Sequence, residues 1–200
     1  MKLKRLFWDK RVGLAAVLLL LAFPYISCTS TKFAVPIPGK NDSVVSNIYI
    51  EYLNIADNYF ELKKYDKAET YYKAAMDNQD IYWNAYYKLA KCYVYEAKWD
   101  DALNAYETLL NRDSENISIQ SSIAYIYAMS GNTEKSIEAY SALIQKAPDQ
   151  SELLENYICV LIAAEKKDEA LEQYNLLKEK FPESKRLEEL GKQFENVTTD

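Results

Sequence analysis

AETYYKAA at residues 68–75, ALNAYETL at 102–109, SIEAYSAL at 136–143 and ALEQYNLL at 170–177 are the four stretches on which the fold depends. Each begins with a small side chain, has a tyrosine four places later, and starts 34 residues after the one before it. Neither an insertion nor a deletion interrupts this spacing. A period of roughly 20 to 50 residues indicates a chain built from stacked structural units.

A second pair of positions follows the same period. One holds small residues and then an isoleucine, and the other holds aromatic residues and then a leucine: Ala56, Ala90, Ala124 and Ile158; Tyr59, Tyr93, Tyr127 and Leu161. The two sets together predict four units: 49–82, 83–116, 117–150 and 151–184. In the segment 185–200, Leu187, Leu190 and Phe194 recur at helical spacing, which predicts a capping helix followed by a tail.

Physical chemistry explains why these residue types recur. Helices cross about 8–10 Å apart only where the side chains between them are small, and the tyrosines fill the gaps between successive pairs. An acidic residue stands at or near the predicted start of each second helix, where it offsets free N–H groups and the helix dipole. These residues are Asp66, Asp100, Glu134 and Asp168. One helix pair cannot bury its own apolar face, so stacking must supply the core.

The repeated pattern resembles the tetratricopeptide repeat (TPR) over residues 49–184. The resemblance implies an all-α fold, a right-handed α-solenoid of four TPR helix hairpins with a C-terminal capping helix. The family's turn glycine is present only as Gly131, and its terminal proline only as Pro148 and Pro182. The fourth unit departs further, with Ile158 and Leu161 in its first helix.

Composition excludes several classes of function. The chain of 200 residues has 24 basic and 30 acidic side chains, and this net charge of −6 disfavours nucleic acid as a partner. Histidine is absent from the sequence, which removes the commonest general base and metal ligand. We therefore expect no enzyme activity, no cofactor and no metal site. Cys92 and Cys159 lie on predicted first helices and are interpreted as small packing residues.

The N-terminus has the composition of an export signal. Five basic residues lie between positions 2 and 11, and residues 12–23 carry no charge. Because this apolar run is shorter than the ~20 residues of a membrane-spanning helix, it predicts a signal peptide over residues 1–27. Residues 28–47 lack helical periodicity and are predicted to be a flexible tether.

Cys28 follows Tyr25-Ile26-Ser27, which resembles the lipobox of bacterial lipoproteins, although Tyr25 replaces the usual leucine. That resemblance implies a lipidated Cys28 at the mature N-terminus. A plain secretory signal, or an uncleaved anchor with an incidental Cys28, stays open as an alternative. After cleavage 19 basic and 29 acidic residues remain, so only the acyl chains would hold the chain at a membrane.

In the TPR family the first helix of each pair lines a concave groove. The groove positions that we expect to bind a partner are mostly apolar or aromatic: Leu53, Asp57, Phe60, Tyr87, Lys91, Val94, Tyr95, Tyr125 and Met129. The fourth unit offers Glu152, Glu155, Cys159 and Ile162 at the same positions. Aromatic residues are enriched at interfaces, so the expected guest is an apolar peptide or an amphipathic helix.

Two alternatives concern this groove. It could be filled from within, by a long first helix or by residues 33–37 of the tether, because a tethered segment has a high effective concentration. The cochaperone type of TPR grips a C-terminal carboxylate with basic and amide side chains. Of the matching positions here only Lys88 could serve, and Asp57 would repel that carboxylate, so this function is not expected.

The sequence as a whole predicts a non-enzymatic TPR lipoprotein that acts as a protein-interaction scaffold in a bacterial cell envelope. It resembles accessory lipoproteins of envelope assembly machines, such as those that help to insert β-barrel proteins. The expected location is a lipid-anchored one, with the periplasmic side of the outer membrane favoured over the inner membrane. The alternative is an uncleaved, membrane-tethered TPR scaffold that faces the cytoplasm.

Overall fold

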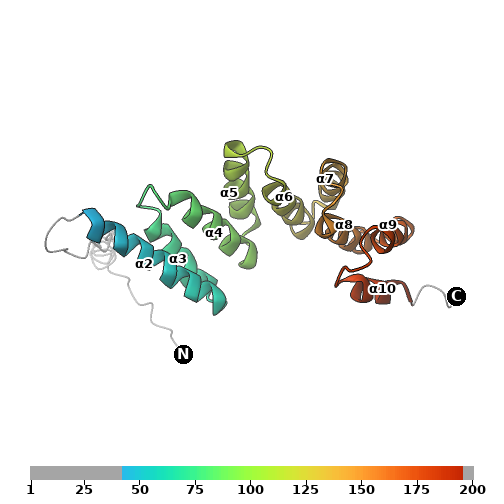
Figure 1. Cartoon of the computed structure of the whole chain (residues 1–200), viewed down its shortest axis with the longest axis horizontal. Helices are drawn as coiled ribbons and strands as arrows, with labels where there is room; N and C mark the ends of the chain where they lie inside the picture. The colour runs from blue at the N-terminus through green and yellow to red at the C-terminus, as the bar shows by residue number, and fades with distance from the viewer. Residues whose placement is uncertain (1–41, 196–200) are drawn as a thin grey trace, which may run out of the picture. The chain divides into compact units, whose positions relative to one another are not determined.

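The computed structural model describes residues 42–195, with side chains from 47 to 194, as a series of α-helices (Figure 1). In order they are α2 (Asp42–Glu61), α3 (Tyr65–Ala75), α4 (Tyr82–Tyr95), α5 (Trp99–Arg112), α6 (Ile117–Met129), α7 (Thr133–Lys146), α8 (Ser151–Ala163), α9 (Lys167–Lys180) and α10 (Leu187–Glu195). The predicted signal peptide, Cys28, most of the predicted tether and residues 196–200 lie outside the described residues.

Each helix packs against the next one along the chain. The pairs α2–α3, α4–α5, α6–α7 and α8–α9 correspond to the four predicted units, and α4 begins one residue before the predicted boundary, at Tyr82. Strands are absent from residues 42–195. The predicted all-α solenoid is therefore confirmed for the described part of the chain.

The repeated small residues form the centre of the packing. All of them are fully buried: Ala56, Ala90 and Ala124 on first helices, and Ala68, Ala102, Ser136 and Ala170 on second helices. Ser136, which replaces alanine in the third unit, donates a 2.7 Å hydrogen bond from Oγ to the carbonyl oxygen of Ala124. This bond satisfies the one hydroxyl that the substitution buries.

The turn inside each hairpin has the same backbone conformation. Its residue with positive φ recurs every 34 positions, at Lys63 (56°), Ala97 (54°), Gly131 (85°) and Glu165 (59°). The next N–H donates to a carbonyl five residues earlier, as from Lys64 to Tyr59 (2.9 Å) and from Lys98 to Tyr93 (2.9 Å). This pattern is the Schellman end of a helix. Three of the four turns thus hold a non-glycine residue in the left-handed region.

The acidic residues predicted at the starts of second helices lie in the first turns of α3, α5, α7 and α9. None of these four helices has a side-chain capping hydrogen bond. Their carboxylates therefore act through the helix dipole rather than as caps. The helix that is capped is α6, where Asn116 accepts a 3.1 Å hydrogen bond from the N–H of Ile119.

The predicted tether is longer than the structure allows. Helix α2 begins at Asp42, so residues 42–47 are helical, whereas the sequence predicted a flexible segment as far as Asn47. Two valines and two serines in this stretch are weak helix formers, so helix propensity alone does not predict a helix here. Asp42 at the first position favours a helix start through the dipole, and Gly39 is the last residue before it that breaks helices.

The fourth unit is covered by α10. The hydroxyl of Tyr174 donates a 3.2 Å hydrogen bond to the carbonyl oxygen of Leu187, and its ring lies 5.2 Å from that of Phe194. A Cβ atom at Gly191 would lie 2.6 Å from the Tyr174 hydroxyl, so only glycine permits this approach. Leu190 is buried with Leu154 and Leu177, which makes α10 part of the core.

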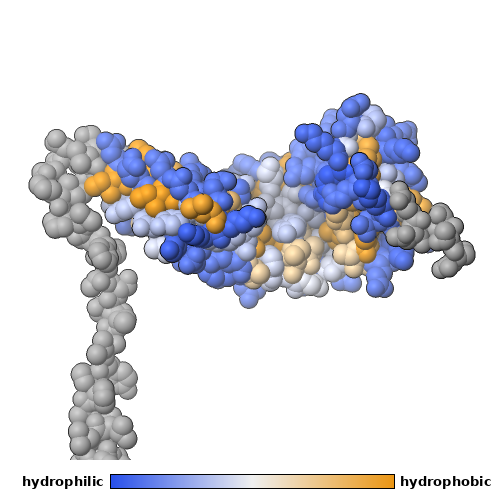
Figure 2. Space-filling model, turned by 90° about the horizontal axis from the view of Figure 1, so that it is seen from below, coloured by the Kyte–Doolittle hydropathy of each residue, from blue (hydrophilic) through white to orange (hydrophobic). Residues whose placement is uncertain are grey.

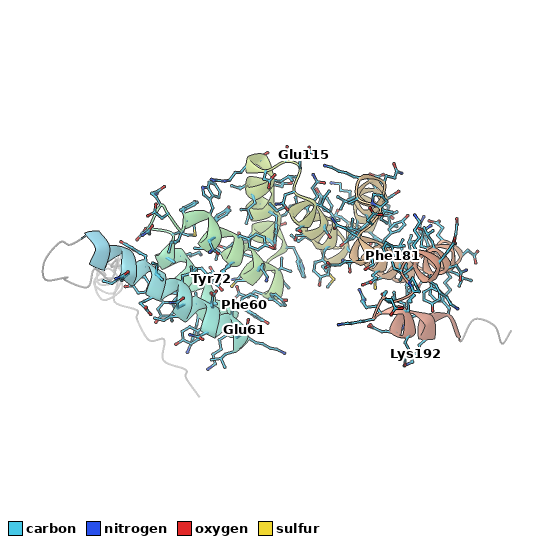
Figure 3. The ribbon with its side chains drawn as sticks, in the orientation of Figure 1. Phe60, Glu61, Tyr72, Glu115, Phe181 and Lys192 are labelled. Carbon is cyan, nitrogen blue, oxygen red and sulfur yellow. The ribbon has the colours of Figure 1, made fainter. Side chains whose placement is uncertain are left out.

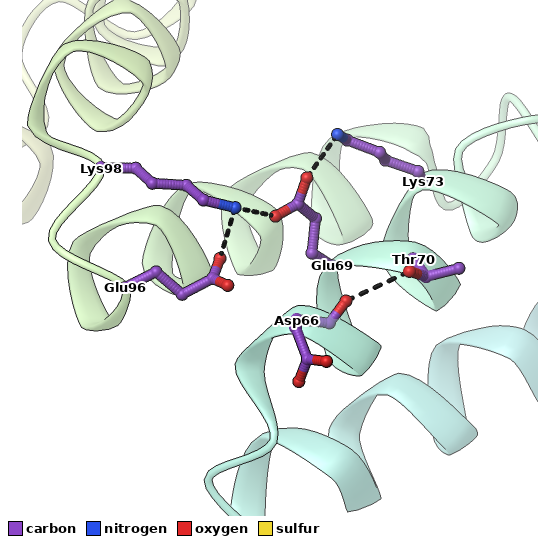
Figure 4. A network of polar contacts seen from close by, with 6 residues as sticks. All are labelled: Asp66, Glu69, Thr70, Lys73, Glu96 and Lys98. Carbon is purple, nitrogen blue, oxygen red and sulfur yellow. Dashed lines mark hydrogen bonds and ion pairs between the residues drawn. The ribbon is translucent and has the colours of Figure 1, made fainter. Parts of the chain in front are cut away.

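A polar network joins the first two units (Figure 4). Glu69 on α3 accepts hydrogen bonds from Lys73 (2.5 Å) and Lys98 (2.7 Å), and Lys98 Nζ also lies 3.1 Å from Glu96 Oε2. Partial burial favours the neutral form of both carboxyls. For Glu69 this effect is outweighed by the hydrogen bonds from Lys73 and Lys98, and the net result is a lowered pKa. For Glu96, burial and the hydrogen bond to Glu69 prevail, and the pKa is raised.

Candidate partner-binding groove

A cavity of about 760 Å³ lies between α4, α6 and α8. Six of the nine predicted groove residues line it, all from α4 and α6: Tyr87, Lys91, Val94, Tyr95, Tyr125 and Met129. Ser118, Ser121 and Ser122 add hydroxyls from α6, and Glu152 and Asn156 add polar groups from α8. The structure therefore brings most of the predicted residues to one site.

Large apolar side chains in this cavity are open to solvent. Tyr95 is 57% exposed, Met129 49% and Tyr125 43%. Apolar side chains grouped on one hollowed surface are unusual for a protein without partners and typical of binding sites. Tyr106 and Tyr140 form the floor of the cavity and are buried. Burial raises the pKa of each to about 12, which keeps both phenols neutral.

A smaller cavity of about 220 Å³ adjoins Lys91 and is lined by Asp57, Phe60, Glu61, Tyr72 and Lys88. Figure 3 labels Phe60 and Glu61 near the end of α2, with Tyr72 beside them on α3. Asp57 accepts a 2.6 Å hydrogen bond from Tyr72 and a 2.5 Å one from Lys88. Burial, and then the hydrogen bond to Asp57, raise the pKa of Tyr72. Asp57 is therefore engaged within the protein.

Phe60 belongs to an aromatic cluster at the edge of the groove. The rings of Tyr65 and Tyr95 stack with centroids 4.9 Å apart, and Phe60 meets each of them edge-on at 5.2 Å. Lys91 lies over the Phe60 ring, with Nζ 5.3 Å from the centroid. The sequence analysis missed Tyr65, because it is the first residue of a second helix and only first helices were expected to line the groove.

Leu53 was predicted to line the groove and does not. It is only 9% exposed and packs in the core with Ala56, Ala68 and Tyr72. On the same helix Ile50 is 40% exposed. The family pattern places the residue correctly on α2, but α3 and α4 close over it.

The fourth unit continues the groove only at the start of α8, because the C-terminal segment covers the rest of that face. Ser184 donates a 2.7 Å hydrogen bond to Glu155, and Arg186 donates to Asn156 (3.3 Å) and to the sulfur of Cys159 (3.1 Å). Ile162 packs in the cluster around Leu190. Three of the four groove positions of α8 are thus covered, and Glu152 stays in the 760 Å³ cavity.

Cys92 is not set up for redox chemistry. Cys92 is fully buried, and burial, assisted by Glu96 and Glu69, raises its pKa to about 12. A reactive thiol needs the opposite shift. Cys159 is half-buried beneath Arg186. Among residues 42–195, no three histidine, cysteine or acidic side chains are grouped to hold a metal ion.

None of the helices described within residues 42–195 combines the length and the apolar character that a membrane span requires.

Two models of the tetratricopeptide repeat match the sequence, over residues 52–79 and 87–151. These ranges cover the first three units and end where the fourth begins. No curated protein matches the chain.

Solved structures match the fold at low identity. A tetratricopeptide repeat protein from Parabacteroides merdae ATCC 43184 has a TM-score of 0.60 and 22% identity over 74% of this chain, which spans 59% of that protein's length. MamA from Desulfovibrio magneticus RS-1, from residue 41 to the end, has a TM-score of 0.58 and 15% identity over 70% of this chain and 76% of its own. YrrB, described as a TPR protein with an unusual peptide-binding site, has a TM-score of 0.53 and 18% identity over 78% of this chain and 82% of its own. These likenesses confirm the repeat solenoid as the fold.

Proposed function

We propose that this solenoid of tetratricopeptide repeats is a non-enzymatic adaptor that holds an apolar segment of a partner protein between α4, α6 and α8. The observation that carries the proposal is the exposure of Tyr95, Tyr125 and Met129 around one 760 Å³ cavity. A short amphipathic helix or extended peptide with a large apolar side chain fits such a site, because burying that side chain on both partners releases water from apolar surface.

Lys91 gives the site a preference among such guests. Lys91 lines both cavities, and its ammonium lies over the ring of Phe60 rather than beside a carboxylate. Lys88, by contrast, is paired with Asp57. A guest that carries an acidic side chain beside its apolar anchor would therefore find a cation. The serines of α6 can hydrogen-bond the guest's backbone.

The groove is tested by a photo-reactive amino acid placed at Tyr95 in the full chain in its own cells. We expect a discrete cross-linked product, and we expect it to disappear when Tyr125→Ser and Met129→Ser are added. The matched control is the same photo-reactive residue at Leu171, which is 41% exposed on α9 and outside the cavity. Equal products from both positions, or a product unaffected by the two serines, would argue against a groove guest.

We further propose that the adaptor is anchored to a bacterial envelope membrane through acyl chains on Cys28, as an accessory of an envelope assembly machine. The basic and apolar leader followed by Cys28 supports this proposal. Metabolic labelling with a radioactive fatty acid tests it. Label is expected on the native chain and on Cys92→Ala, and not on Cys28→Ala. Absence of label from the native chain would favour the uncleaved scaffold that faces the cytoplasm.

The alternative occupant to be tested is the segment 33–37, which lies outside the described residues. If this apolar segment competes with the guest, Phe33→Ser with Ile37→Ser will increase the yield of the Tyr95 cross-link. An unchanged yield would remove the self-docking alternative.

A further inference from the structure

Helix α2 has an apolar edge that no other described element covers. Ile48, Ile55 and Leu62 are seven residues apart and therefore lie along one edge of the helix. Leu62, in the turn that follows the helix, is 63% exposed, and the two isoleucines are half-buried. None of the three belongs to the core cluster that α2 shares with α3 and α4. In Figure 2, apolar surface forms a band at this end of the helical array.

The other units show what normally covers this edge. Leu89 and Ile123 stand 34 and 68 residues after Ile55, and both are buried. Leu89 packs in one cluster with Ala75 of α3, and Ile123 packs with Leu109 of α5. In each case the second helix of the preceding unit covers the position. Within residues 42–195 no helix precedes α2, so Ile55 lacks the neighbour that its counterparts have.

The apolar edge is complementary to itself. Ile48 and Leu62 lie at equal distances along the chain from Ile55, so an antiparallel copy centred on Ile55 places each Ile48 against the other chain's Leu62. Tyr52 and Tyr59 flank Ile55 on the side toward α3 and add aromatic surface; the Tyr59 ring stacks on Tyr71, and the Tyr52 ring is tilted against it. The spacing 48, 52, 55, 59 and 62 alternates four and three residues, as in the seam of a coiled coil.

The charges along α2 also favour an antiparallel copy. Glu51 is exposed in the first half of the helix, whereas Lys63 and Lys64 are exposed just after its end. In an antiparallel pair, the basic end of each helix lies toward the half of the other that carries Glu51. The helix dipoles are opposed in the same arrangement, which is favourable. Glu61 lines the 220 Å³ cavity and so points away from this edge.

We propose that a second copy of this chain docks here, α2 against α2, about a two-fold axis at Ile55. Such an isologous contact uses one surface patch twice and closes after two chains. It leaves the 760 Å³ groove of each copy free, so the dimer would present two grooves. The inference is independent of the proposed guest, because no residue of the dimer edge lines that cavity.

Disulfide trapping tests the arrangement directly in the full chain. Positions 48 and 62 of one chain are roughly 20 Å apart along the helix, too far for an internal bond. Under mild oxidation, Ile48→Cys with Leu62→Cys is expected to give a covalent dimer on a non-reducing gel. Each single variant still contains the natural cysteines and is expected to run on that gel at the mass of one chain. A double variant that remains monomeric, or single variants that cross-link equally well, would overturn the two-fold contact.

Light scattering of the detergent-solubilised full chain gives the second measurement. The native chain is expected at twice the mass of one chain, and Ile55→Glu with Leu62→Glu at the mass of one, with unchanged helical circular dichroism. Leu171→Glu changes an equally apolar, 41% exposed residue on α9 and should leave the dimer intact. A native chain that is monomeric at ~100 μM, or a glutamate variant that remains dimeric, would overturn the proposal. Cross-linking at Tyr95 would test the groove separately in either case.

Discussion

The hydroxyl of Ser184 donates a 2.7 Å hydrogen bond to Oε1 of Glu155. This contact joins the segment after α9 to the face of α8 that continues the groove of the earlier units. Glu155 is buried there, and Arg186 lies close by over Asn156 and Cys159. The C-terminal segment therefore covers most of the α8 face, and the space available to a guest is the cavity between α4, α6 and the first turns of α8.

Removal of the Arg186 side chain should uncover Cys159. A side-chain hydrogen bond from a charged group contributes roughly 1.5–3 kcal/mol, so we expect Arg186→Ala to speed maleimide labelling of Cys159 about tenfold. Labelling is followed by peptide mass spectrometry, which separates Cys159 from Cys92. Lys185→Ala is the control, because Lys185 is exposed and lies next to Arg186 in the chain. Equal labelling rates in both variants would contradict the closure of α8 by Arg186.

Glycine at the left-handed turn positions should stabilise the fold. A non-glycine residue in the αL region costs roughly 1–2 kcal/mol, which is partly offset by the greater freedom of glycine in the unfolded chain. We expect Ala97→Gly, and likewise Lys63→Gly and Glu165→Gly, to raise the free energy of unfolding by about 0.5–1 kcal/mol each. Urea titration with an unchanged slope measures this.

The matched control for the turns is Gly131→Ala. A Cβ at Gly131 would meet nothing within 4 Å, so the effect of the substitution is confined to the backbone. We expect it to lower the free energy of unfolding by about 1 kcal/mol. A neutral Gly131→Ala would show that positive φ at this turn carries no strain.

Alkaline pH should destabilise the solenoid through its buried tyrosines. Burial raises the pKa of Tyr106 and Tyr140 to about 12, above an unfolded value of about 10. Between these values the unfolded chain releases protons that the folded chain keeps, so stability falls as pH rises. At pH 11 we expect a loss of roughly 1.4 kcal/mol for each tyrosine. Unfolding free energies from pH 9 to 11 measure it, and Tyr106→Phe with Tyr140→Phe should flatten the slope.

Glu69 and Glu96, which both contact Lys98 in the network of Figure 4, should respond oppositely to substitution. The lowered pKa of Glu69 means that its carboxylate stabilises the fold above the unfolded pKa of about 4.3, and that this stability is lost as pH falls through the folded value. The raised pKa of Glu96 means that its neutral form is favoured, so its carboxylate opposes folding at pH 7.

At pH 7 we therefore expect Glu69→Gln to lower the free energy of unfolding by about 1 kcal/mol. We expect Glu96→Gln to leave it unchanged or raise it. The difference between the native chain and Glu69→Gln should shrink as pH falls below 4. Equal losses for both variants at pH 7 would contradict the assigned directions.

The repeated positions made the fold predictable. Small residues such as Ala68 and Ala102 have one physical reason to recur at a fixed spacing, and the structure buries each of them between helices. The groove residues on α4 and α6 were predictable for the same reason, because the positions not used for packing face the cavity. Leu53 was assigned wrongly since the pattern does not show how closely α3 and α4 approach α2.

Contacts made outside the repeat could not be predicted. Arg186 reaches Asn156 and Cys159 across about 30 residues, and nothing in the period of 34 couples those positions. The start of α2 at Asp42 depends on weak helix formers. The stacking of Tyr65 on Tyr95 at the edge of the groove is likewise outside the repeat, because Tyr65 is not at a repeated position.

Gly191 lets α10 lie close against Tyr174, on the face of the fourth unit where a further hairpin would stack. Tyr174 presents the same kind of ring that receives the next hairpin in earlier units, but here α10 lies against it at a distance that no side chain at position 191 would allow. A fifth hairpin appended after Lys180 would have to displace this nine-residue helix before it could stack. The C-terminal helix thus covers the stacking face of the fourth unit, and a duplicated unit is expected to stack more readily upstream of α10 than after Lys180.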